Sequence, residues 1–101
     1  MEHIYNDLKN LREKGALVHC ITNYVAMNIN ANTLLSIGAS PLMSHARSEL
    51  GEIAAISSCL VSNIGTLDDD WRPSFLEASK FYVEQEKPII LDPVGSGASK
   101  L

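Results

Sequence analysis

The apolar residues of this chain alternate between two spacings along its length, and this alternation leaves few folds open. Four segments place apolar residues three or four positions apart, as amphipathic helices do. Shorter and nearly continuous apolar runs follow each of them, which is typical of strands covered on both faces. A repeated helix–strand order predicts parallel strands joined by right-handed crossovers. The expected fold class is therefore α/β, with an open and mostly parallel sheet.

The predicted helices cover residues 2–14, 24–37, about 45 or 48 to 57, and about 71–86, and the predicted strands cover 16–21, 39–43, 59–64 and 89–91. Gly15 and Gly38 are stop signals after the first two helices. Pro41 cannot donate a ladder hydrogen bond, so its strand is expected to be short or at an edge. Buried stripes are expected on the helices, with Met27, Ala31, Leu34 and Leu35 in the second, and Phe75, Ala78 and Tyr82, broadened by Leu76 and Val83, in the last.

Composition narrows the class of protein further. The 101 residues suit a single domain, and 46% hydrophobic content is too high for a disordered chain. Neither a bilayer-spanning apolar run nor a signal-peptide core is visible, which predicts a cytoplasmic protein with no membrane partner. Twelve acidic residues oppose eight basic ones without a Lys/Arg cluster, so nucleic acid is not an expected partner either. Cys20 and Cys59 are expected to be free thiols, with a disulfide as the less favoured alternative.

Polar and small residues follow the predicted strands, where ligands bind in α/β sheets. Asp92 opens a turn rich in Gly and Ser, which could hold a hydrated Mg²⁺ and direct backbone N–H groups at an anion. The segment 63–66 could place an amide and a hydroxyl on a small ligand, with Gly65 allowing close approach of the backbone. Taken alone, both patterns fit an ordinary turn somewhat better than a site.

Other residues with chemical potential are better explained structurally. His19 lies within an apolar strand, which favours a hydrogen-bonded core histidine over a catalytic one. Cys20 has no neighbouring cation to lower its thiol pKa, so it is a poor nucleophile candidate. Met43 suits either a pocket wall or, more commonly, the core. The acids at 68–70 are expected at a helix start, where they face the positive end of its dipole, rather than in a metal cluster.

Three motifs together resemble the hydroxyethylthiazole kinases of the ribokinase-like superfamily. They are HCITNYV, SNIGTL and LDPVG, and the resemblance extends over about residues 16 to 99. It implies a ribokinase-like fold and transfer of phosphate from ATP, with Mg²⁺, to the hydroxyethyl group of 4-methyl-5-(2-hydroxyethyl)thiazole in thiamine salvage. It also implies a homotrimer with this thiazole alcohol bound near a subunit interface.

The resemblance assigns roles to particular residues. Asn23, Val25, Met43, Gly65 and Thr66 would line the thiazole site, and Asp92 would lie near Mg²⁺ and the phosphates. In the family an acidic residue commonly follows soon after the methionine that corresponds to Met43, and this chain departs from that pattern. A receiver or dinucleotide-binding domain is disfavoured, because residues 22 and 23 replace the acids or glycines that those folds need after the first strand.

The family is more than twice as long as this chain, and its C-terminal part supplies the nucleotide pocket and the residue that activates the hydroxyl. Residues 1–101 are therefore expected to form a single but incomplete domain, with its catalytic and nucleotide-binding residues unknown. The strand ending at Leu91 is expected to lack a covering helix and a neighbouring strand. Such a chain is predicted to be the substrate-binding part of a kinase, inactive alone. The alternative is a non-catalytic α/β module for binding or oligomerisation.

Overall fold

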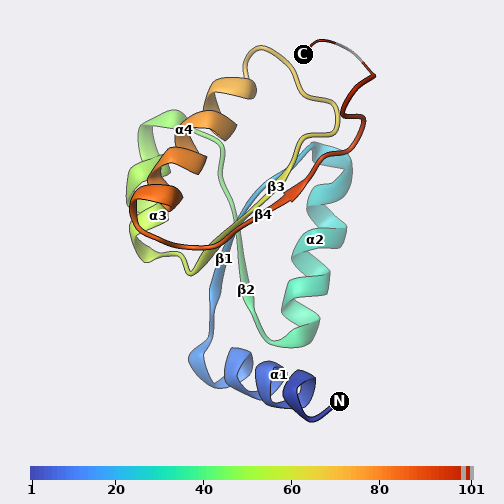
Figure 1. Ribbon diagram of the computed structural model, residues 1–101, viewed down its shortest axis with the longest axis vertical. Coiled ribbons are helices and arrows are strands. Elements are labelled where there is room, and N and C mark those ends of the chain that lie inside the picture. Colours follow the sequence, from blue (N-terminus) through green and yellow to red (C-terminus); the bar gives the residue numbers. More distant parts are fainter. Residues whose placement is uncertain (99, 101) are drawn as a thin grey trace.

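A computed structural model describes residues 1–98 and 100, and in it helices and strands alternate along the chain (Figure 1). The elements are α1 (Glu2–Lys14), β1 (Leu17–Ile21), α2 (Tyr24–Ile37), β2 (Ser40–Met43), the 3-10 turn η1 (Arg47–Glu49), α3 (Leu50–Ile56), β3 (Cys59–Asn63), α4 (Arg72–Glu84) and β4 (Ile89–Asp92). The predicted α/β order is confirmed. The predicted third helix is divided, since η1 precedes α3.

The strands form one parallel sheet in the order β2-β1-β3-β4. The central strand β1 pairs Val18 with Pro41 on one side and with Cys59 on the other. Pro41 therefore lies in an edge strand, as its missing N–H predicted. The carboxyl ends of the strands point away from α1, and the loops that follow β1, β3 and β4 lie at that end (Figure 1).

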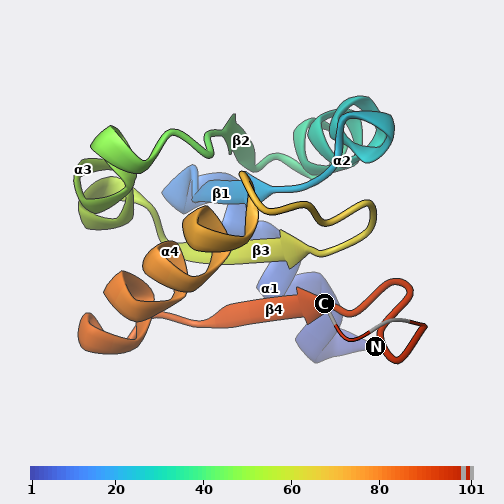
Figure 2. The same ribbon diagram turned by 90° about the horizontal axis from the view of Figure 1, so that it is seen from above.

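Helices lie on both sides of the sheet (Figure 2). On one face α3 and α4 pack over β1 and β3, burying Leu50, Leu60 and Tyr82 completely. On the other face α2 packs mainly on β2, against a smaller cluster of Val18, Cys20 and Ala39. Alternate residues of β1 supply the two clusters because strand side chains point to opposite faces in turn.

The sheet is covered unevenly. Ile90 is 60% exposed and Leu91 is 59% exposed on the edge strand β4. Figure 2 shows α2 beside β1 and β2, whereas α1, drawn behind β3 and β4, lies beyond the ends of the strands, as Figure 1 shows. The expectation that this strand would lack part of its cover agrees with these exposures.

Some of the apolar stripes predicted from the sequence include residues that are exposed in the structure. Phe75, Ala78 and Tyr82 of α4 are buried as predicted, but Leu76 and Val83 are exposed. Each of these two follows a buried residue directly, and one step turns a helix by about 100°, so their side chains leave the narrow contact with the sheet. Leu35 of α2 is also exposed, and no residue of α2 is fully buried.

Two backbone features end the helices that frame the sheet. Gly38 adopts φ 96° after α2, and a Cβ there would overlap Cγ of Arg12, whose Nε–H donates to the Ile37 carbonyl at 3.2 Å. After α4, Glu86 adopts φ 55°, and the Lys87 N–H bonds the Tyr82 carbonyl at 2.9 Å. This left-handed cap ends α4 at Glu84, two residues before the predicted boundary.

Both cysteines are free thiols, as expected, although Cys59 is only partly buried.

Within the described ranges, no helix combines the length and apolar character needed to cross a bilayer.

Candidate functional site at the carboxyl ends of the strands

The Asn23 side chain connects two of the loops at this end of the sheet. Its Oδ1 accepts the Ala26 N–H at 2.9 Å, which caps α2. Its Nδ2 donates to the Gly65 carbonyl at 3.2 Å. The side chain that caps α2 is thus also a bridge from the loop after β1 to the loop after β3.

Asn63, the last residue of β3, extends this bridge to β4. Its Oδ1 accepts the Gly65 N–H at 2.9 Å and an Asn23 Nδ2–H at 3.4 Å. Its Nδ2 donates to Oδ2 of Asp92 at 3.5 Å. Hydrogen bonds therefore join side chains at, or just beyond, the carboxyl ends of three adjacent strands.

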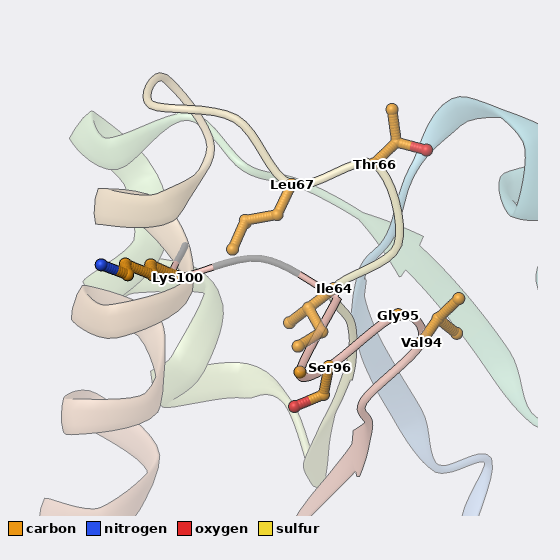
Figure 3. A pocket seen from close by; sticks show the side chains of 8 residues that line it. Ile64, Thr66, Leu67, Val94, Gly95, Ser96 and Lys100 are labelled. Carbon is orange, nitrogen blue, oxygen red and sulfur yellow. The ribbon is translucent and has the colours of Figure 1, made fainter.

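A cleft of about 430 Å³ opens between the loops that follow β3 and β4 (Figure 3). Its lining residues are Ile64, Thr66, Leu67, Val94, Gly95, Ser96, Gly97 and Lys100. Its volume lies in the range of small-molecule sites, which runs from about 300 to 1,000 Å³. Asp92 directly precedes the turn that forms one wall, and its side chain is exposed.

Thr66 is the backbone outlier of this region. It adopts φ 55°, which is rare for a β-branched residue and favours glycine instead. Strained residues of this kind concentrate at ligand sites, where the surrounding structure holds them in place. Here the Asn23–Asn63–Gly65 bonds fix the loop immediately before it.

A second, smaller cavity of about 150 Å³ lies beside the start of α2. It is lined by Asn23, Tyr24, Val25, Thr66, Asp68 and Trp71. Trp71 stacks on His45, with ring centroids 4.0 Å apart, and meets Tyr24 edge-on at 5.4 Å. These aromatic residues were not predicted as site residues, because their spacing fits helix starts and loops equally well. One signal in the sequence could have pointed to Trp71. It is the only tryptophan of the chain, and it directly follows the Asp68–Asp70 run.

The structure brings together only part of the residue set predicted for thiazole. Asn23, Val25 and Thr66 line the smaller cavity, and Thr66 also lines the larger cleft. Gly65 is buried, and its backbone approaches the Asn23 amide rather than open space. Met43 lines neither cavity and packs against the Val18–Cys20–Ala39 cluster.

His19 is fully buried, and both of its ring nitrogens have partners. The Ser44 carbonyl, 2.8 Å from Nε2, can only accept, so Nε2 carries the proton. Nδ1 then accepts from the Tyr82 hydroxyl at 2.9 Å. Burial lowers the pKa of His19 below its ordinary value of 6.5, which favours the neutral ring. This is the structural role that the sequence favoured.

Two further expectations about reactive groups agree with the structure. Burial raises the pKa of the Cys20 thiol to about 11, so almost no nucleophilic thiolate forms at neutral pH. Asp68 Oδ1 accepts the Trp71 N–H at 2.7 Å just before α4. This bond is what a helix-start acid is expected to make.

No group of three or more His, Cys, Asp or Glu side chains capable of holding a metal occurs within residues 1–98 and 100. Asp92 alone presents a carboxylate beside the glycine-rich turn, and one of its oxygens receives the Asn63 amide. One carboxylate fits Mg²⁺ when water and phosphate oxygens supply the remaining ligands.

Comparison with a solved structure defines the class of protein. A hydroxyethylthiazole kinase structure from Pyrococcus horikoshii superimposes with a TM-score of 0.95 and 52% sequence identity, over 99% of this chain and 39% of that one. The architecture is therefore that of the N-terminal part of a ribokinase-like kinase fold.

The sequence comparisons identify the family. A profile of the hydroxyethylthiazole kinase family matches residues 8–101. The hydroxyethylthiazole kinase of Methanococcus vannielii is 58% identical over the whole chain, and that of Pyrococcus horikoshii is 52% identical over 99% of it. The chain belongs to the hydroxyethylthiazole kinase family, and it spans 38% of the length of both relatives.

Proposed function

We propose that this chain is the substrate-binding part of a hydroxyethylthiazole kinase, acting in thiamine salvage. The observation that carries the proposal is the cleft between the loops after β3 and β4, at the end of the sheet where α/β proteins bind ligands. The names of the relatives, which are similar along the entire chain, supply the substrate class. The thiazole alcohol is expected against Thr66 and the apolar wall of Ile64, Leu67 and Val94.

The polar wall of the cleft suits the phosphate end of this reaction. Gly95 and Gly97 adopt φ 72° and 90°, and a Cβ on either would meet no atom within 4 Å, which leaves their backbone open to a ligand. Asp92 would hold a hydrated Mg²⁺ there, and Mg²⁺ supplies charge neutralisation of the phosphates when ATP is bound. Lys100, which lines the same cleft, adds a positive charge.

The first prediction separates binding from catalysis. The 101-residue chain is expected to bind the thiazole alcohol saturably, as measured by isothermal titration calorimetry and by a rise in its unfolding temperature. It is expected to transfer no phosphate from Mg-ATP, because positioning and charge stabilisation around the transferred group need more partners than Asp92 and Lys100.

The controls decide between the two candidate functions. The thiazole alcohol should bind equally to an Asn10→Ala variant, altered on exposed α1 at the opposite end of the sheet. Absence of binding to the unaltered chain would contradict the substrate assignment and leave an oligomerisation module. Phosphorylation of the alcohol at ordinary kinase rates would contradict the prediction that the chain is inactive alone.

A homo-oligomer, a trimer by family resemblance, is part of the same proposal. The outer face of α2 supports it, because Tyr24, Val25 and Ile29 are exposed and the helix carries no charged residue. Exposed apolar surface of this kind favours protein association. Sedimentation equilibrium is expected to give a mass above that of one chain, and Val25→Glu, at a position 90% exposed, should lower it. A monomer at tens of micromolar would remove this part of the proposal.

The proposal places the protein in the cytoplasm, where ATP and Mg²⁺ are supplied. The excess of twelve acidic over eight basic residues supports the absence of a nucleic-acid partner.

A further inference from the structure

Asn63 lies at the centre of the hydrogen bonds that join the loops of the cleft, yet it lines neither cavity. Its carboxamide oxygen faces Gly65 and Asn23, and its amino group faces Asp92. Its side chain is therefore placed to act on the positions of other groups rather than on a ligand.

The chemistry of its partners permits only one orientation of this carboxamide. The Gly65 N–H can only donate, so the atom facing it at 2.9 Å must be the oxygen. The amino group then faces Asp92, whose ionised carboxylate can only accept. A flipped amide would place two N–H donors together at Gly65 and two oxygens together at Asp92. Both partners therefore require the same orientation of the Asn63 carboxamide.

Close packing connects this amide to both walls of the cleft. A Cβ on Gly65 would lie 3.1 Å from Asn63 Oδ1 and 3.3 Å from Cγ1 of Val94. The loop after β3 and the turn after β4 therefore meet at Gly65 with no spare space. Movement of the Asn63 side chain would displace both walls.

We propose that Asn63 is a positioning residue that fixes the 63–66 loop and Asp92 relative to each other. Its oxygen sets the loop that ends in the strained Thr66, and its amino group aims the Asp92 carboxylate. The consequence for ligand binding rests on the proposed function of the cleft, whereas the positioning itself does not.

Two variants of the chain separate the two halves of this role. Asn63→Asp keeps an acceptor for the Gly65 N–H but turns a second carboxylate oxygen toward Asp92. Asn63→Ala removes both bonds. Assigned ¹H–¹⁵N amide signals report each loop directly, and Asn10→Ala serves as the matched asparagine control on α1.

The expected pattern differs between the variants. Signals of residues 94–97 should move in both, whereas those of residues 64–66 should move strongly in Asn63→Ala and return close to wild type in Asn63→Asp. The affinity for the thiazole alcohol should fall about tenfold in Asn63→Ala, which corresponds to about 1.4 kcal/mol and is the size of effect expected when hydrogen bonds are lost.

The outcomes distinguish this proposal from the function on which its consequence rests. Unchanged signals at 94–97 in both variants, or the same pattern of shifts in the two, would overturn the positioning role. If the wild-type chain binds no thiazole alcohol, the proposed function fails, and the amide signals still decide the role of Asn63.

Discussion

Replacing Tyr82 by alanine is expected to lower the free energy of unfolding by about 4 kcal/mol. Tyr82 is fully buried between α4 and the sheet, where it packs with Leu50, Ala54 and Leu60. Truncation of a buried aromatic residue costs about 3 to 5 kcal/mol through lost burial and the cavity left behind. The total stability of a domain is only about 5 to 15 kcal/mol, so this single change removes a large share of it.

The variant Tyr82→Phe isolates the hydroxyl, because it keeps the ring and creates no large cavity. It leaves Nδ1 of the buried His19 without its donor, at an expected cost of about 1 to 2 kcal/mol. Urea unfolding followed by circular dichroism measures both losses. Tyr5→Ala, on exposed α1, should change stability by less than about 0.5 kcal/mol. A phenylalanine variant as stable as wild type would mean that the His19 bond contributes nothing.

Replacing Gly65 by alanine is expected to have the largest effect on the proposed site. The new Cβ would lie 2.7 Å from Nδ2 of Asn23, which is itself held by the Gly65 carbonyl and by its capping bond to α2. Relief of that overlap would break one of these bonds and move the loop that carries Thr66. We expect the affinity for the thiazole alcohol to fall by tenfold or more, measured by calorimetry.

A matched control for this variant is Gly15→Ala, where φ is 59° but no atom lies within 4 Å of the added Cβ. It should cost about 1 kcal/mol of backbone strain and leave binding unchanged. In the double variant Gly65→Ala/Asn23→Ser the nearest clashing atom is absent and a capping side chain remains, so part of the affinity should return. Full affinity in Gly65→Ala alone would show that this loop does not shape the site.

The local order of the fold could be predicted because short-range patterns carry it. The spacing of Phe75, Ala78 and Tyr82 located the last helix and its buried side. Pro41 indicated an edge or a short strand, and the structure has both. Leu76 and Val83 were wrongly predicted to lie in the buried stripe. Hydrophobicity alone does not tell how wide a stripe of a helix the neighbouring sheet can cover.

The candidate site was predictable only at the level of its loops. Because the carboxyl ends of parallel strands meet at one edge, the polar residues that follow them had to lie near one another. The partners within that edge were not predictable, since the Asn23–Asn63 and Asn63–Asp92 contacts join residues 40 and 29 positions apart. No local pattern encodes such pairs.

The sequence by itself determined the alternating α/β order, the free cysteines and the motifs that resemble the hydroxyethylthiazole kinases. These follow from periodicity, composition and short motifs, which are properties of neighbouring residues. Only the tertiary structure decided that Gly65 is needed for space beside Asn23, that Thr66 rather than Gly65 takes the left-handed backbone, and that Asn63 faces Asp92. Each of these depends on which strands become neighbours in the sheet, and that choice is made by packing between segments far apart in the chain.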